Sequence, residues 1–167
     1  GAMVLAGLAW WLQKAPDPAG DAEPDDVALA VLPFERFGVP STDGRRLELL
    51  LADSLLAELW RADLEGVTLI GRATLRPYQG REDAAAAVAR DLGARLLFEG
   101  SIVRNETGWQ VTGRLLEMPG GRVLWLDTVE STADVLPTRN MAAQLAESLA
   151  RAWTTRPETP ALQEPAK

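Results

Sequence analysis

The pattern of apolar and polar residues predicts a domain in which strands and helices alternate at first and strands dominate later. The first apolar run covers residues 27–34 and includes Pro33. An unbroken apolar run, unlike an alternating one, is typical of a strand that is buried on both faces of a sheet. Because proline lacks an N–H group, we expect the strand to end near Pro33 and the chain to turn there.

Three segments are predicted to be helices. The first covers residues 43–61 with Asp43 as its N-cap, the alanine-rich second covers residues 82–92 and ends at Gly93, and the third starts at Pro137. The predicted apolar face of the first helix consists of Leu51, Ala52, Leu55, Leu56, Leu59 and Trp60. The predicted apolar face of the third consists of Met141, Ala142, Leu145, Leu149 and Trp153. We expect these helices to pack on a sheet.

The remaining strands are predicted from short apolar or alternating runs. Residues 67–70 form a second short buried strand, and Gly71 and Gly80 bracket the loop that follows it. Three more strands, residues 95–104, 109–117 and 123–130, are joined by segments with the composition of hairpin turns. Helices between the early strands imply parallel pairing, and hairpins imply antiparallel pairing. The predicted fold class is therefore α/β: one domain of order β-α-β-α-β-β-β-α with a mixed five-stranded sheet and helices packed on it.

The domain is predicted to cover residues 27–153 and to lie between two segments that do not pack. Residues 13–26 contain three prolines and five acidic residues, which indicates an extended acidic linker. Residues 154–167 are predicted to be a disordered tail. Residues 1–3, Gly-Ala-Met, are typical of a scar left by cloning and are set aside from the fold.

Residues 4–12 form an apolar segment that is too short to cross a bilayer, which takes about 20 residues. We interpret this segment as the end of a truncated transmembrane helix. Trp10 and Trp11 stand at its end, where aromatic residues meet the membrane interface, and residues 15–35 contain no Lys or Arg, as expected on the non-cytoplasmic side. The alternatives are a short helix packed on the domain or an apolar contact between two copies.

The composition argues against an enzyme. The chain has neither Cys nor His, so it has no thiolate nucleophile, no histidine base, no cysteine-based metal site and no histidine, the commonest metal ligand. Its two lysines, Lys14 and Lys167, both lie outside the predicted domain. We therefore predict no enzymatic activity, no metal and no cofactor. The formal net charge of −7 and the absence of a basic stripe also argue against nucleic-acid binding by this segment.

Six local sequences occur in an order that resembles one known family. They are residues 27–34 with Leu-Pro-Phe at their end, 51–56, 71–74, 89–95, 97–104 and 121–125. This set resembles the TolB amino-terminal-like domain family, whose members include the extracytoplasmic domains of membrane-anchored bacterial regulators of the CadC and ToxR type. A related sheet occurs in the curli secretion lipoprotein and in lipoproteins that activate cell-wall synthases. The winged helix and the helical repeats that often flank the domain in the regulators have no counterpart in this sequence.

The resemblance implies a location in the cell envelope and a binding role. The first hypothesis is a non-enzymatic periplasmic sensor or interaction domain of an inner-membrane-anchored signalling protein, such as a one-component transcriptional regulator with a DNA-binding domain before the membrane helix. Its partner would be another protein or a second copy in a homodimer. The alternative is an envelope assembly or activator module that binds a larger cell-wall or secretion protein.

Several polar residues are candidates for a ligand or partner site. Glu35 and Arg36 follow the first strand, and Arg72, Arg76 and Tyr78 follow the second. Ligands of open α/β sheets bind beyond the carboxyl ends of strands, so these side chains could line one anion-binding edge; the alternative is a solvated surface.

Further candidates are two tryptophans and a glutamate of the hairpin region, each of which has two interpretations. Trp109 and Trp125 on adjacent strands could form an exposed partner-binding patch or pack against a helix. Glu99 could contact a ligand, but we prefer the alternative in which Gly100 allows a bulge or a close backbone approach and Glu99 lies on an exposed face. The adjacent acids Glu82 and Asp83 are explained by the helix that starts there.

Overall fold

The computed structural model of the protein describes residues 25–38 and 46–156. The predictions for residues 1–3 and 4–12, for the linker up to residue 24, for Asp43 as an N-cap and for the tail from residue 157 onward lie outside the described residues. Within them, the last helix reaches Thr154, the first residue of the predicted tail.

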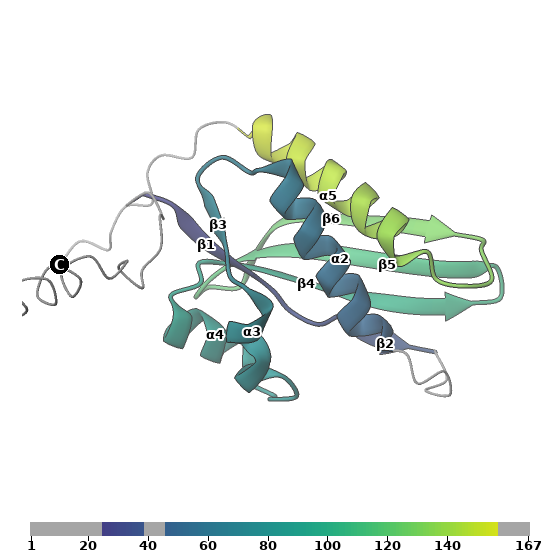
Figure 1. Ribbon diagram of the computed structural model, residues 1–167, viewed down its shortest axis with the longest axis horizontal. Coiled ribbons are helices and arrows are strands. Elements are labelled where there is room, and N and C mark those ends of the chain that lie inside the picture. Colours follow the sequence, from purple (N-terminus) through teal and green to yellow (C-terminus); the bar gives the residue numbers. More distant parts are fainter. Residues whose placement is uncertain (1–24, 39–45, 157–167) are drawn as a thin grey trace, which may run out of the picture.

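The centre of the fold is a mixed sheet of six strands, which confirms the predicted α/β class (Figure 1). Its order is β3-β1-β4-β5-β6, and β2 pairs with β4 beyond the end of β1. Strands β1, β2, β3 and β4 pair in parallel, whereas β4, β5 and β6 form antiparallel hairpins. The strands are β1 (Val27–Val31), β2 (Glu35–Phe37), β3 (Val67–Leu69), β4 (Leu96–Asn105), β5 (Gly108–Glu117) and β6 (Arg122–Ser131).

The sixth strand arises from a break in the first apolar run. Strand β1 pairs with β4 as far as Val31, the chain turns through Leu32-Pro33-Phe34, and β2 then resumes parallel pairing with Glu35 opposite Ser101. Within the break, the Leu32 amide still donates a hydrogen bond to the Phe98 carbonyl at 2.9 Å. The turn at Pro33 is therefore as predicted, and the added element is the short strand beyond it.

One face of the sheet is covered by two helices that lie side by side, α2 (Leu47–Ala62) and α5 (Thr138–Thr154) (Figure 1). Their apolar faces match the predicted ones except at Trp60, which is 76% exposed. Trp60 follows the half-buried Leu56 by one turn and lies over the outer side of edge strand β3, where no further described element covers it. Leu51, Leu55, Met141, Leu145 and Leu149 are all fully buried between the two helices and the sheet.

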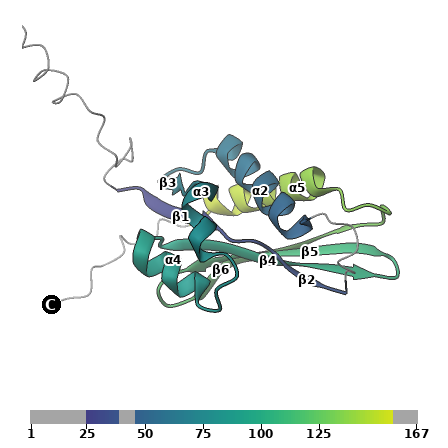
Figure 2. The ribbon, with the colours of Figure 1, turned by 60° about the horizontal axis from the view of Figure 1, so that its bottom comes forward.

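The opposite face is covered at one end only (Figure 2). The predicted helix of residues 82–92 is α4 (Ala84–Leu92), and the predicted loop between Gly71 and Gly80 instead contains two short helical turns, α3 (Arg72–Leu75) and η2 (Arg76–Tyr78). Leu75 anchors these turns in a second apolar cluster. That cluster consists of Ala30, Leu75, Val88, Ala94, Leu97 and Met118. Tertiary burial of Leu75 therefore stabilises turns that have no strong local helix signal.

Beyond α4, the second face of the sheet has no helix over it among the described residues (Figure 2). Side chains alternate between faces along a strand, so the register identifies which residues lie here. This open face consists of Glu35, Phe37, Glu99, Ser101, Val103, Gln110, Thr112, Arg114, Leu126, Thr128 and Glu130. Phe37 and Leu126 are 53% and 57% exposed on it. Across the described residues, no helix is long and apolar enough to span a membrane.

Candidate functional site

A cleft lies at the break between β1 and β2, next to the open face, and it is more enclosed than the other hollows of similar size in the described structure. It has a volume of about 410 Å³ and lies beyond the carboxyl end of β1, where the sequence places a site. Its walls come from the β1–β2 break, the end of α3, the loop into α4, and the middle of β4 and β5. The lining residues are Leu32, Pro33, Phe34, Glu35, Leu75, Tyr78, Gln79, Gly80, Arg81, Glu82, Ala84, Ala85, Glu99, Gly100 and Arg114.

Two of the seven predicted site residues, Glu35 and Tyr78, meet in this cleft. Glu35 comes from β2 and is exposed, and Tyr78 comes from η2 and is half-buried. Residues that follow two neighbouring parallel strands are thus brought to one edge of the sheet, as expected. Their shared position does not test binding, so a binding role for Glu35 and Tyr78 stays a prediction.

Three predicted arginines do not line the cleft. Arg36 points to the other face of the sheet, where its Nε lies 3.1 Å from Glu48 Oε2 of α2. Arg72 forms an ion pair with Asp53 of α2. Arg76 is exposed and is not part of the cleft wall. These three arginines therefore do not share an edge with Glu35 and Tyr78, because alternation along β2 and pairing with α2 direct two of them elsewhere.

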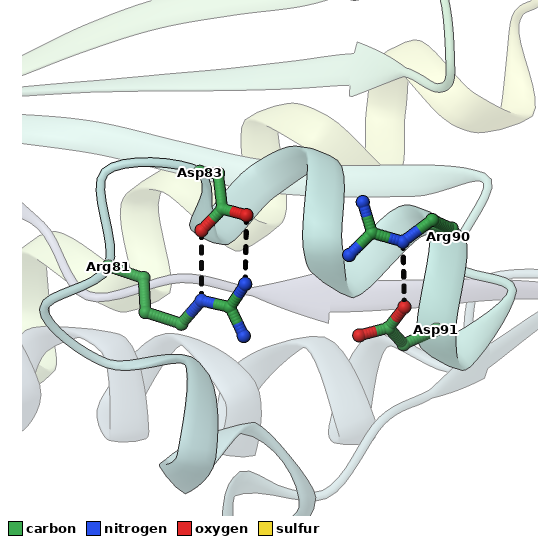
Figure 3. A network of polar contacts seen from close by, with 4 residues as sticks. All are labelled: Arg81, Asp83, Arg90 and Asp91. Carbon is green, nitrogen blue, oxygen red and sulfur yellow. Dashed lines mark hydrogen bonds and ion pairs between the residues drawn. The ribbon is translucent and has the colours of Figure 1, made fainter.

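Arg81 lines the cleft, and Figure 3 shows its pairing with Asp83, which is not part of the lining. The Arg81 Nε and a terminal nitrogen donate to the two oxygens of Asp83 at 2.9 and 2.8 Å. The hydrogen bond to Asp83 and the attraction between the charges raise the pKa of Arg81. The same hydrogen bond, more than any other influence, lowers the pKa of Asp83. A separate pair within α4, Arg90 with Asp91 at 2.9 Å, does not line the cleft.

Arg114 is the second guanidinium of the cleft, and it is also paired. A terminal nitrogen of Arg114 lies 3.1 Å from Glu99 Oε1, directly across the β4–β5 pair. Glu99 lies on the open face of the sheet, in line with the preferred interpretation, and it is half-buried in the cleft wall. The preferred explanation for Gly100 is confirmed, because a Cβ there would lie 2.5 Å from the Phe34 ring; the strand pairing is regular at Gly100, so the close approach and not a bulge applies.

The charges of the cleft do not balance. Arg81 donates two hydrogen bonds to Asp83, and Arg114 is paired with Glu99 through one terminal nitrogen, while its buried Nε has no hydrogen-bond partner among the described residues. Glu35 and Glu82 complete the charged lining, and neither forms an ion pair with any other described residue. The cleft therefore presents two carboxylates whose charge is not neutralised locally, next to apolar walls.

Trp109 and Trp125 lie on adjacent strands, as predicted, but they point into the core instead of forming an exposed patch. Trp109 is 8% exposed, and Arg104 stacks over its ring at 4.8 Å from the centroid. Trp125 is half-buried with its ring centroid 5.7 Å from that of Phe98. Both positions fall on the sheet face that α2 and α5 cover, so the packing alternative describes them.

Sequence reasoning missed Arg81, Glu82 and Arg114 as parts of the cleft, and a signal for one of them was present. The predicted turn after Asn105 fixes the register of β4 against β5, and that register places Arg114 opposite Glu99. Arg81 and Glu82 follow Gly80 in a segment whose course depends on how Leu75 packs, so no local pattern indicates their position.

The chemistry available in the cleft is ionic contact, hydrogen bonding and apolar packing. Its functional groups are carboxylates, guanidinium groups, one phenol and one primary amide. Within residues 25–38 and 46–156, no three His, Cys, Asp or Glu side chains converge in a way that could hold a metal ion. The arrangement is suited to binding.

Comparison with known proteins supports the fold. No protein-family model and no curated protein sequence matches the chain. Among solved structures, TolB from Acinetobacter baumannii is similar over 80% of this chain with a TM-score of 0.51 and 15% identity. The chain spans 29% of the length of that TolB. This similarity confirms a TolB-like fold for the described domain.

Smaller proteins are also similar, at lower scores. A PelC dodecamer from Paraburkholderia phytofirmans matches 77% of this chain and 90% of its own at 15% identity, with a TM-score of 0.45. The LpoB carboxy-terminal domain from Salmonella enterica matches 74% of this chain and 91% of its own at 17% identity, with a TM-score of 0.42.

Proposed function

We propose that this domain is a non-enzymatic interaction domain on the periplasmic side of a bacterial inner membrane, where it binds a protein partner. The observation that carries the proposal is the open face of the sheet. It combines exposed apolar side chains, Phe37 and Leu126, with polar ones that are already paired, such as Thr112 with Thr128 at 2.9 Å. A surface of this composition suits a protein partner, because the apolar groups gain from burial and the paired groups lose little.

The proposed location is supported by features of the sequence. The apolar segment 4–12 is interpreted as the end of a membrane helix, and the absence of Lys and Arg from residues 15–35 fits the non-cytoplasmic side. The six local sequences that resemble TolB amino-terminal-like domains support the same location. In this proposal residues 13–26 are the linker between the membrane and a domain at residues 27–153, and residues 154–167 are a tail.

The finer proposal is that the full-length protein is a signalling protein, a one-component regulator with a DNA-binding domain on the cytoplasmic side. Partner binding or self-association would then change the spacing of the membrane helices of two copies. The alternative is an assembly or activator module that presents the open face to a larger cell-wall or secretion protein. A winged helix upstream of residue 4 in the natural gene favours the regulator, whereas a lipidated cysteine there favours the assembly module.

The location is tested with the natural full-length protein carrying a reporter that is active only in the periplasm, fused after Lys167. The proposal expects an active reporter. The same reporter fused to a protein of known cytoplasmic location is the control. An inactive reporter on a stably produced fusion contradicts both the regulator and the assembly module.

The binding surface is tested by site-specific photo-crosslinking in cells. A photo-reactive residue at Leu126, on the open face, is compared with one at Arg139, which is exposed at the start of α5. We expect protein adducts from Leu126 and fewer from Arg139, and mass spectrometry then separates a second copy of this chain from another protein. Equal adducts from both positions, or none from Leu126, contradict the proposed surface.

A further inference from the structure

We propose that the cleft at the β1–β2 break binds a guanidinium or ammonium group carried on an aliphatic stem, that is, an arginine or lysine side chain of the protein partner. The preference for a cation follows from the cleft itself. The identification of its source as a protein partner rests on the proposed function.

The volume and walls of the cleft fit such a group. Its volume of about 410 Å³ is within the range of small-ligand sites, which extends from about 300 to 1,000 Å³. Leu32, Phe34 and Leu75 contribute apolar walls. Long basic side chains bury their methylene stems against apolar surface while the charged end stays with polar groups. The Phe34 ring packs closely over Gly100, and its centroid lies 6.1 Å from that of the Phe98 ring.

The charge of the cleft selects a cation over an anion. The Arg81 guanidinium is held by both oxygens of Asp83, and one terminal nitrogen of Arg114 lies 3.1 Å from Glu99 Oε1. An incoming anion would have to compete with these carboxylates and would also meet Glu35 and Glu82. An incoming cation, in contrast, would have Glu35 and Glu82 as partners. The two glutamates come from β2 and from the loop before α4, so they approach the cleft from different elements.

The position of the cleft connects it to the proposed binding surface. Glu35, Glu99 and Arg114 belong to the open face as well as to the cleft lining. A partner that covers Leu126 across the strands from Arg114 would have side chains close to the cleft mouth. One basic side chain inserted there would fix the partner's register on an otherwise smooth sheet.

The charge preference is tested by NMR chemical-shift mapping on the 167-residue protein. The probe is Nα-acetyl-arginine N-methylamide at millimolar concentration, and the matched probe is the citrulline analogue, which has the same shape without the charge. The acetylated glutamate analogue tests the opposite sign. We expect the arginine probe to shift the backbone amides of Glu35, Gly80, Glu82 and Gly100, and the other two probes to leave them unchanged.

Variants assign the binding to the proposed carboxylates. The double variant Glu35→Gln with Glu82→Gln is expected to weaken arginine binding by about tenfold, the ratio that corresponds to one charge-assisted contact. Glu106→Gln, in the exposed turn between β4 and β5, removes the same kind of charge away from the cleft and should leave binding unchanged. Arg114→Gln releases Glu99 and should tighten binding, whereas an anion site would be lost by this change.

The outcomes separate this inference from the proposed function. Cleft shifts with the glutamate probe, or no cleft shifts with any probe, overturn the cation site. A loss of arginine binding that is as large in Glu106→Gln as in the double variant overturns it too, because the binding is then a general response to net charge. The crosslinking result at Leu126, which tests the proposed function, does not depend on any of these three NMR outcomes.

The source of the cation is tested by a photo-reactive residue at Gln79, which lines the cleft. Adducts with a protein in cells, lost when the double variant is introduced, support a partner's side chain. Arginine binding in vitro without any protein adduct at Gln79 overturns the protein source and indicates a small cationic metabolite, while the charge preference stands.

Discussion

The ring of Phe34 occupies the space in which a side chain at Gly100 would begin. A Cβ at Gly100 would lie 2.5 Å from Phe34 Cε1 and would also collide with the Thr112 carbonyl oxygen. The β1–β2 break, the floor of the cleft and the β4–β5 pairing therefore meet at one glycine. Its importance is steric, since its backbone conformation is open to any residue.

Gly100→Ala is expected to lower the free energy of unfolding by about 3 kcal/mol, the upper part of the usual range for overpacking, because one neighbour is backbone. Gly120→Ala, where no other atom lies within 4 Å of the new Cβ, is the control and should change it by less than about 0.5 kcal/mol. Urea denaturation measures both. Equal stability of the two variants would show that β4 shifts to accommodate the methyl group.

Leu145→Ala in α5 is expected to lower the free energy of unfolding by about 2–5 kcal/mol, since the side chain is fully buried between α5 and the sheet and its removal leaves a cavity. Leu126→Ala removes the same atoms from the open face and should change stability by less than about 0.5 kcal/mol. Thermal and urea unfolding measure the contrast. A large loss of stability in Leu126→Ala would mean that the open face is covered in the isolated protein.

Arg36→Gln should lower stability by about 1 kcal/mol, because the ion pair with Glu48 connects β2 to α2 and both side chains are largely shielded from solvent. The same variant should leave binding of the arginine probe unchanged, since Arg36 lies on the other face of the sheet. Urea denaturation and the NMR titration report the two effects separately. A changed affinity with unchanged stability would return Arg36 to the binding site.

The Arg81–Asp83 pair predicts a small dependence of stability on acid pH. The pKa of Asp83 is lowered in the folded protein, so the carboxylate stabilises the fold above its ordinary pKa of 3.8, and this stabilisation is lost as the pH falls through the lower, folded value. The urea midpoint of Asp83→Asn should thus fall below that of the parent at neutral pH and approach it at the lowest pH. Asp63→Asn, in the αL position after α2, provides the comparison. A difference between Asp83→Asn and the parent that grows on acidification contradicts the assignment.

The sequence predicted the elements that have a clear local pattern and missed those that depend on contacts with distant parts of the chain. The buried strand before Pro33, the faces of α2 and α5 and the hairpins were predictable, because each is encoded by several consecutive residues with a clear period. Strand β2 and the turns α3 and η2 were not, since β2 depends on its pairing with β4 and the two turns depend on the burial of Leu75. Trp60 has the right helical period but no neighbour beyond β3.

The location of the candidate site was predictable from the sequence, but the sign of its charge was not. The rule that ligands bind beyond strand ends identified the edge shared by Glu35 and Tyr78. The sign of the charge depends on which arginines are neutralised, and this is decided by Glu48, Asp53, Asp83 and Glu99 from other elements or neighbouring positions. Only the pairing of Arg114 with Glu99 could be inferred, from the hairpin register.

The antiparallel half of the sheet pairs segments that are close in the sequence, whereas the parallel half pairs segments that are far apart. This difference predicts an order of folding. Strands β4, β5 and β6 meet through hairpins between sequence neighbours, whereas Leu29 of β1 pairs with Leu96 of β4 across a long stretch of chain that contains α2, β3, α3, η2 and α4. Closing the shorter loops loses less chain entropy, so the meander should form in the folding transition state and the parallel half should dock afterwards. In stopped-flow kinetics, Val111→Ala in β5 should therefore slow refolding, while Leu29→Ala in β1 should mainly accelerate unfolding.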